Sequence, residues 1–127
     1  MEKKSALILG IETSCDETAL ALINGEKILG NITLTQTIHE KYGGVFPMLA
    51  KREHGRNLIP ILKKLLMESG FGNSKFQIPS SKKLQEAMSY ELEAILEREP
   101  ELLKQFLEFV PTIEKPPIDA IAVTEGP

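Results

Sequence analysis

The stretch Ala6–Leu22, with the sequence ALILGIETSCDETALAL, decides the fold that we expect for this chain. Its first part, Ala6–Ile11, is short, aliphatic and uncharged, which is typical of a strand buried on both faces. Glu12–Thr18 then gathers carboxylates, hydroxyls and a thiol, and Thr18–Ile23 resumes the apolar run. The pattern predicts two strands joined by a polar hinge. That hinge is either a phosphate or metal–phosphate site or an ordinary polar β-turn, and composition leaves both open.

The composition is that of a globular protein of one domain or a piece of a larger one. Of the 127 residues, 42% are hydrophobic and 26% are charged, and the formal net charge is -3. This near-neutral charge gives the chain alone no electrostatic reason to bind nucleic acid. The single cysteine excludes a disulfide framework within the chain and suits a reducing compartment. No apolar run approaches the ~20 residues of a membrane span. We therefore expect a cytoplasmic chain without membrane contacts.

The residues after the hinge predict a third strand and a long helix. Asn24-Gly25 is a two-residue hairpin signal. Lys27–Leu34 should then form an antiparallel strand that places three apolar residues on one face, namely Ile28, Ile32 and Leu34. Pro47 suits the first turn of a helix, and Gly70 suits its end.

The predicted helix from Pro47 to Ser69 has a clear apolar stripe. Its residues follow i, i+3, i+4, i+7 and i+8 spacing, which is typical of a helix that covers a core. The stripe consists of Leu58, Ile61, Leu62, Leu65 and Leu66. Pro60 lies inside this run and should kink the helix or split it in two.

The composition changes at residue 71, where a polar loop begins, and residues 71–117 predict a helical hairpin. Phe71–Pro79 is a polar loop, and Ser80 or Ser81 can cap a helix whose apolar stripe ends at Leu96. Pro100 should open a shorter helix with four residues inward, namely Leu103, Phe106, Leu107 and Val110. Ile118–Val123 then predicts a fourth strand, parallel to the first through a right-handed crossover. Since the chain stops one loop past this strand, we expect that more protein follows.

The hinge supplies the candidate functional residues. Asp16 or Glu17 could orient a water, hold Mg²⁺ through its waters, or act as a base. Adjacent residues of an extended segment point to opposite sides, so only one of them should face a given ligand. Thr13 and Ser14 could donate to phosphate oxygens together with the N–H groups of the turn. Gly126, at the end of the fourth strand, could let the backbone approach a phosphate closely.

Other reactive side chains have simpler interpretations. Cys15 is a nucleophile or a packed thiol, and no histidine beside it in the sequence could activate it. His39 and His54 lack compact metal-ligand spacing, so loop or helix-capping positions are the simpler reading. Lys51 and Arg52 face either an anionic ligand or solvent. The sequence contains no HExxH or other zinc motif, so nothing supports a metallopeptidase.

Three blocks of the sequence together resemble the tRNA threonylcarbamoyladenosine transferases, formerly labelled O-sialoglycoprotein endopeptidases. Ile8–Thr18 looks like the N-terminal signature of that family. His39–His54, which contains the run Tyr42–Pro47, is similar to its second block. Ile118–Pro127 looks like the opening of its third. The blocks occur in the family's order and cover about half of the chain.

The resemblance implies an α/β fold, a partial actin-like ATPase (ribonuclease-H-like) domain. Three strands would be antiparallel and a fourth parallel, with residues 71–117 as an inserted helical hairpin. Residues 1–127 would be the N-terminal part of the first of two such domains. The parent enzyme moves threonylcarbamoyl from its adenylate to N6 of the adenosine adjoining the anticodon, in tRNAs that decode codons starting with A. We expect the chain alone to be inactive.

The resemblance also implies roles for particular residues. Asp16 and Glu17 match positions that face the active cleft, where we expect them to be catalytic, with Thr13, Ser14 and Gly126 contacting the nucleotide. The complete enzyme implies a divalent metal, iron or zinc, and a threonylcarbamoyl-adenylate or ATP-type nucleotide. The paired metal-binding histidines of the family lie beyond this chain, so we assign no metal ligand to it.

The resemblance further implies a partner surface on helix 47–69. This helix matches the surface that packs against a paralogous actin-like subunit in bacterial relatives, and a homodimer is the alternative. The residues that we expect at that interface are Leu58, Ile61, Leu62 and Leu65. tRNA would bind only the complete enzyme. Met48 departs from the acidic residue usually found after that proline, which removes a ligand-facing role there. A non-enzymatic binding or dimerisation module of the same fold is the alternative function.

Overall fold

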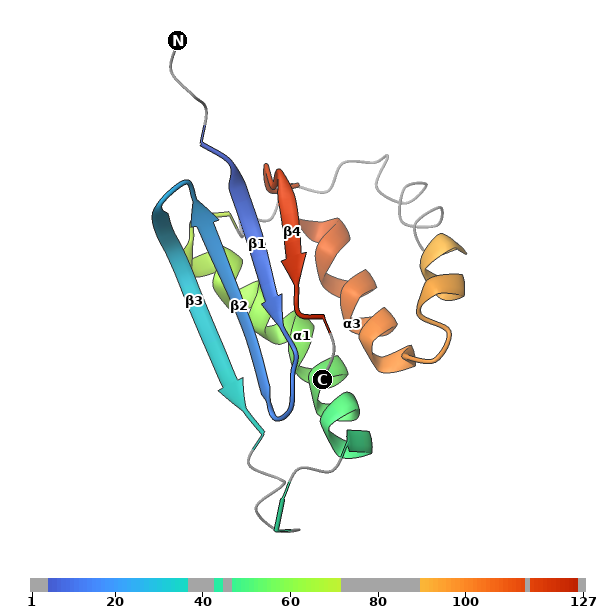
Figure 1. Cartoon of the computed structure of the whole chain (residues 1–127). Helices are drawn as coiled ribbons and strands as arrows, with labels where there is room; N and C mark the ends of the chain where they lie inside the picture. The colour runs from blue at the N-terminus through green and yellow to red at the C-terminus, as the bar shows by residue number, and fades with distance from the viewer. Residues whose placement is uncertain (1–4, 37–42, 45–46, 72–89, 114, 126–127) are drawn as a thin grey trace.

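Four strands form one sheet, built from β1 (Leu7–Glu12), β2 (Glu17–Asn24), β3 (Lys27–Thr35) and β4 (Ala120–Val123) in the order β3-β2-β1-β4. The computed structural model describes residues 5–36, 43–44, 47–71, 90–113 and 115–125. The first three strands are antiparallel and β4 is parallel to β1, as the sequence predicts. The helices are α1 (Pro47–Glu68), α3 (Pro100–Phe109) and the 3-10 helix η2 (Val110–Thr112), and Figure 1 shows α1 behind the sheet with α3 beside it.

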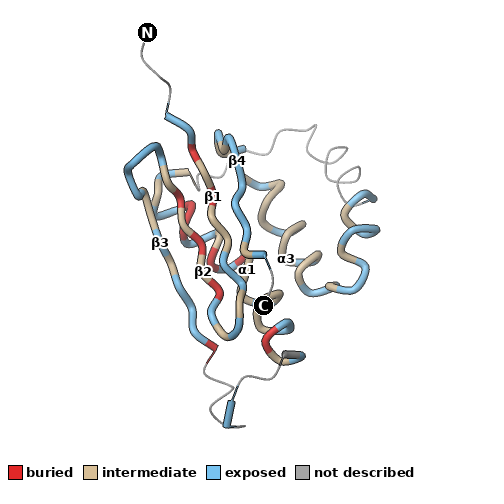
Figure 2. The backbone as a smooth tube through the Cα atoms, in the orientation of Figure 1, coloured by how far each residue is buried: buried red, intermediate tan, exposed pale blue. Residues whose placement is uncertain are grey.

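The core lies between α1 and one face of the sheet (Figure 2). Alternate residues of β1 and β2 point toward α1, because side chains alternate between the two faces of a strand. The buried cluster consists of Leu7, Leu9, Leu20, Leu22, Ile61, Leu65 and Leu66. Burial of each such aliphatic side chain contributes about 1.5–3 kcal/mol. The stripe that the sequence predicts on α1 is thus the helical half of the core.

Pro60 does not split α1, which runs without a break from Pro47 to Glu68. Pro60 and Arg56 are both exposed, so the carbonyl that lacks its helical N–H partner lies on the solvent side of the helix. Water can satisfy that carbonyl there. Gly70, whose φ is +85°, follows the end of the helix as predicted.

The β2–β3 hairpin turns one residue later than the sequence predicts. Asn24 pairs with Lys27, so the two turn residues are Gly25 and Glu26. The φ of Gly25 is +62°. The primed turns that join tight hairpins require a positive φ at this first position, which glycine adopts without strain.

A bulge in β3 corrects the predicted apolar face of that strand. Leu22 pairs with Gly30 and Ile23 with Ile28, which leaves Leu29 as the extra residue. Ile28 is therefore on the opposite face from Ile32 and is 65% exposed. Leu29 packs against the core in its place. The prediction that Ile28 shares a face with Ile32 is wrong, because sequence alternation alone does not show a bulge.

The second half of the described chain is helical. Residues 90–95 form a helical segment, and α3 begins at Pro100 as predicted. The four residues predicted to face inward from this helix are half-buried, and α3 has no fully buried residue. Residues 80–89 of the predicted preceding helix lie outside the described residues. Within the described residues, none of the helices has the length and apolar character needed to cross a membrane.

Candidate functional site

The hinge forms a turn, here called the β1–β2 turn (Thr13–Asp16), at the edge where β1 and β4 end together. The two strands are parallel, so their C-terminal ends meet. Thr124 follows β4, and its N–H and hydroxyl both donate to the Ile11 carbonyl, at 3.0 and 3.2 Å. The Thr13 N–H donates to the Thr124 hydroxyl at 3.3 Å. Ligands of open α/β sheets bind outside the carboxyl ends of neighbouring strands, which is the position of this turn.

A carboxylate and a left-handed residue define the β1–β2 turn. The Ser14 N–H donates to the Glu12 carboxylate at 3.1 Å, and the Ser14 hydroxyl donates to the same oxygen. This hydroxyl and then the N–H lower the pKa of Glu12, because both favour the charged carboxylate. Cys15 has a φ of +50°, and the Glu17 N–H closes the turn on the Ser14 carbonyl at 3.3 Å.

The turn presents hydrogen-bond donors. Among the described residues, the backbone N–H groups of Cys15 and Asp16 have no acceptor. Successive N–H groups of this kind bind anions. The Asp16 side chain is half-buried and that of Glu17 is exposed. The structure thus brings Thr13, Ser14, Asp16 and Glu17 to one turn, while the catalytic and binding roles that we expect for them stay predictions.

His54, on α1, contacts the β1–β2 turn from the helix side. Its Nε2 lies 2.9 Å from the Cys15 carbonyl oxygen. Its Nδ1 lies 2.8 Å from the Thr18 hydroxyl and 3.2 Å from the Gln36 amide nitrogen. The Asp16 carbonyl accepts from the Gln36 N–H at 2.7 Å, so Gln36 also supports the turn. A loop or helix-capping position for His54, as expected from sequence, is wrong.

The sequence does contain a signal for this network. His54 precedes Leu58 and Ile61 by four and seven residues, so it lies on the core-facing stripe of α1. Thr18 is in phase with Leu20 along β2 and is fully buried. Two polar residues on the two faces that form the core must be paired, since an unpaired buried polar group costs free energy.

Two expected residues and the metal lie outside what the structure tests. Gly126 and His39 are not among the described residues. Within the described ranges, no group of three or more His, Cys, Asp and Glu side chains comes together as a metal site would require.

The stripe expected at a partner interface instead faces the sheet of this chain. Ile61 and Leu65 are 5% and 0% exposed, and Leu58 and Leu62 are half-buried against the same core. Ile61 and Leu65 are thus buried against the chain's own sheet in this fold, whereas Leu58 and Leu62 remain partly exposed. A partner of α1 would have to use its exposed side, where Met48 is 88% exposed.

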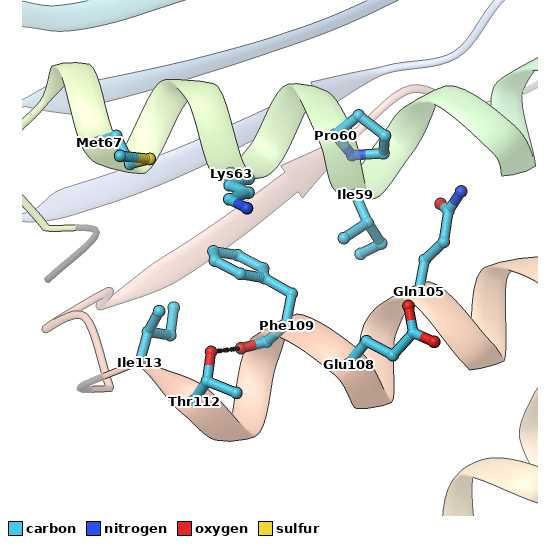
Figure 3. Close-up of a pocket in the computed structure, with 9 residues that line it drawn as sticks. All are labelled: Ile59, Pro60, Lys63, Met67, Gln105, Glu108, Phe109, Thr112 and Ile113. Carbon is cyan, nitrogen blue, oxygen red and sulfur yellow. Dashed lines mark hydrogen bonds between the residues drawn. The ribbon is translucent and has the colours of Figure 1, made fainter. Parts of the chain in front are cut away.

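Ion pairs and an aromatic contact join α1 to the residues around α3. Lys51 pairs with Glu99 at 3.3 Å and Arg56 with Glu101 at 3.6 Å. Lys51 thus faces a carboxylate of its own chain. An open pocket of about 570 Å³ lies between the two helices (Figure 3), lined by Ile59, Pro60, Lys63, Met67, Gln105, Glu108, Phe109, Thr112 and Ile113.

A mixed sheet of three antiparallel strands and one parallel strand, covered by a helix on one face, is consistent with part of an actin-like domain. The family model described as tRNA N6-adenosine threonylcarbamoyltransferase matches residues 27–77. Over the matched part, the chain is similar to this family, and it resembles the N-terminal part of its members, as the motifs predict.

Curated relatives agree with the family model. A tRNA N6-adenosine threonylcarbamoyltransferase of Riemerella anatipestifer is 50% identical over 66 residues, which cover 52% of this chain and 19% of the relative. Proteins of the same name from Porphyromonas gingivalis and Cytophaga hutchinsonii are 43% and 47% identical, over 54% and 58% of this chain and 20% and 21% of their own lengths. The chain thus spans about a fifth of the length of these relatives.

Proposed function

We propose that this chain supplies the adenylate-facing edge of a tRNA threonylcarbamoyltransferase. The observation that carries the proposal is the β1–β2 turn, which presents donors at the shared end of β1 and β4 in a chain similar to that family. The complete enzyme would move threonylcarbamoyl from its adenylate to N6 of the adenosine adjoining the anticodon, in tRNAs that read codons starting with A. Such an enzyme works in the cytoplasm.

The residues of the turn divide into two roles. The Thr13 hydroxyl and the N–H groups of Cys15 and Asp16 would donate to the adenylate phosphate. The Ser14 hydroxyl donates to Glu12 and would reach the phosphate only by leaving that carboxylate. In the transfer, the N6 amine forms a bond to the carbamoyl carbon, and the bond from that carbon to the phosphate oxygen breaks to release AMP. The amine must also lose a proton, which the carboxylate of Asp16 or Glu17 would accept as a general base.

Transfer would need more protein than this chain. The part of this chain that matches the relatives covers only about a fifth of their length, so we propose that tRNA binding, the metal and the rest of the nucleotide contacts belong to further sequence. A paralogous actin-like subunit or a second copy would dock on the exposed side of α1. Transfer of threonylcarbamoyl to tRNA by this chain without another polypeptide would contradict this division.

Binding of threonylcarbamoyl-adenylate, followed by isothermal titration calorimetry, tests the proposal. Thr13→Val removes one hydroxyl donor and should weaken binding about fivefold, since a hydrogen bond contributes about 1 kcal/mol. Thr33→Val is the matched control, because Thr33 is an exposed threonine of β3 away from the turn. Its affinity should equal that of the unsubstituted chain. Absence of binding, or equal affinities of the two variants, would contradict the proposal.

A binding or dimerisation module is the second candidate function. The observation that favours it is β4, which is an edge strand of the described sheet and has Ile121 62% and Val123 66% exposed. Such an edge can pair with another chain. Sedimentation at high concentration should then show a dimer that Val123→Lys dissociates. A strictly monomeric chain would exclude self-association through this edge.

A further inference from the structure

We propose that His54 is a positioning residue for the β1–β2 turn: it holds the Cys15 carbonyl and thereby fixes the direction of the donors that the turn offers. The inference rests on the proposed function in so far as those donors bind an adenylate. It requires no contact between His54 and the ligand.

The hydrogen bonds of His54 define one tautomer. A backbone carbonyl only accepts, so the hydrogen on the ring must be at Nε2, 2.9 Å from the Cys15 oxygen. Nδ1 is then the acceptor. It receives the Thr18 hydroxyl at 2.8 Å and an N–H of the Gln36 amide at 3.2 Å. The other N–H of that amide donates to the Ala50 carbonyl at 3.2 Å. All of these contacts are satisfied by the neutral ring with hydrogen at Nε2.

Buried groups hold the ring in place. Thr18 is 0% exposed and Gln36 is 4% exposed. They come from β2 and from the residue that follows β3, and Ala50 belongs to α1 itself. The imidazole is therefore fixed between the sheet and the helix before it reaches the turn, as is typical of polar networks that specify one arrangement.

The Cys15 backbone needs such support. Its φ of +50° lies in the left-handed region, which is unfavourable for a residue with a side chain. Such a conformation persists only where surrounding contacts enforce it. The hydrogen bond from His54 acts on the carbonyl of this same residue.

The held carbonyl also directs the neighbouring donor. The Cys15 carbonyl and the Asp16 N–H belong to one planar peptide, and no described peptide bond is cis. In a trans peptide the C=O and N–H groups point in opposite directions. Because the carbonyl points at His54, the Asp16 N–H points away from it, on the side of the turn opposite the imidazole. Loss of the imidazole contact would free this peptide to rotate, and the donor would lose its fixed direction.

Three variants of the whole 127-residue chain separate positioning from general stability. His54→Ala removes the contact. His54→Gln keeps an amide N–H for the carbonyl and an oxygen that can accept from Thr18. Ile59→Val removes one methylene from a residue of α1 that is 5% exposed, which destabilises the helix packing without touching the turn.

Two spectroscopic readouts of the chain alone test the inference. Long-range ¹H–¹⁵N spectra should show hydrogen on Nε2 of His54, and hydrogen on Nδ1 would overturn the inference. The one-bond ¹Hα–¹³Cα coupling of Cys15, which differs between positive and negative φ, should report the left-handed conformation in the unsubstituted chain, His54→Gln and Ile59→Val. It should be averaged in His54→Ala. An unchanged coupling in His54→Ala, or equal averaging in Ile59→Val, would overturn it.

Affinity for threonylcarbamoyl-adenylate provides the readout of function. His54→Ala should bind about tenfold more weakly, whereas His54→Gln stays within about threefold and Ile59→Val is unchanged. Equal weakening in Ile59→Val and His54→Ala would overturn positioning. If the unsubstituted chain binds no adenylate while the Cys15 coupling still depends on His54, the proposed function fails and the positioning of the turn stands.

Discussion

Residues 7–71 and residues 90–113 are held by different kinds of contact. The first region buries seven aliphatic side chains between the sheet and α1, and a polar network ties that helix to the β1–β2 turn. In the second region α3 has no fully buried residue, and its link to α1 includes exposed ion pairs and a cation–π contact of Lys63 with Phe109 at 5.9 Å.

The difference shows which region can carry a site. A ligand-binding turn must be fixed to within a fraction of an ångström, and rigid, buried neighbours provide this. The β1–β2 turn has such neighbours in β1, β4 and His54. The pocket between α1 and α3 has one wall in α3, which contains no fully buried residue. We therefore place the functional site at the turn.

Shortening one apolar side chain in each region should show the largest difference between them in the loss of unfolding free energy. Leu65→Ala should lower the free energy of unfolding by about 2–5 kcal/mol, because Leu65 is 0% exposed and leaves a cavity. Leu103→Ala, in the half-buried face of α3, should cost less than half as much. Urea unfolding followed by circular dichroism measures both. Equal losses would contradict a difference in packing between the regions.

Gly30 tests how closely the sheet and α1 approach. A Cβ at this position would lie 2.7 Å from Leu65 Cδ1 and 2.8 Å from Ser69 Oγ. Gly30→Ala should therefore destabilise the chain by about 1–3 kcal/mol through overpacking. In the Leu65→Ala background the same substitution should cost less, because the clash with Cδ1 is gone. Gly44→Ala is the control, since nothing lies within 4 Å of its Cβ. If the losses in unfolding free energy caused by Gly30→Ala and Leu65→Ala simply add in the double variant, the contact between the two positions is contradicted.

The ion pair between the two regions should contribute little. Lys51 and Glu99 are 68% and 31% exposed at their side chains. A double-mutant cycle of Lys51→Ala and Glu99→Ala should give a coupling of at most about 1 kcal/mol, which falls as salt is added. Urea unfolding at low and high ionic strength measures it. A larger coupling that is insensitive to salt would mean that α3 is anchored as firmly as the core.

The smallest effect concerns the charge of the turn. The Ser14 hydroxyl and N–H lower the pKa of Glu12, so their stabilising interaction is complete above the ordinary pKa of a glutamate and is lost as the pH falls through the lowered value. Ser14→Ala should raise the pKa of Glu12, as followed by carboxyl ¹³C shifts. Thr124→Val should raise it less, because Thr124 is a minor cause. No change in Ser14→Ala would contradict this arrangement.

Sequence patterns predicted the parts of the fold that depend on local chemistry. Short apolar runs and turn signals predicted β1, β2 and the polar turn, and the aliphatic run after a helix predicted the parallel β4. Pro100 marked the start of α3. The features that sequence missed depend on three-dimensional pairing. The bulge at Leu29 places Ile28 on the opposite face of β3 from Ile32. Ile61 and Leu65, which were expected at a partner interface, pack against the sheet of the chain itself.

The candidate site was predicted only in part for the same reason. Thr13, Ser14, Asp16 and Glu17 are consecutive or nearly so, and their concentration of polar groups is visible in the sequence. His54 is 39 residues from Cys15 and meets it only because α1 crosses the sheet. The position of His54 on the apolar stripe of α1 was the signal available in the sequence. It indicates that His54 has a buried hydrogen-bond partner, but it does not identify the partner residue.

A titration of the ¹⁵N-labelled chain with threonylcarbamoyl-adenylate tests the central claim most directly, because it compares both regions in one spectrum. The account predicts that the largest amide shifts occur at Glu12–Thr18, with smaller changes at His54 and Thr124, which contact the turn. Shifts concentrated on Lys63, Gln105 and Phe109 would place the ligand in the α1–α3 pocket, and that result, or the absence of any shift, would contradict the claim.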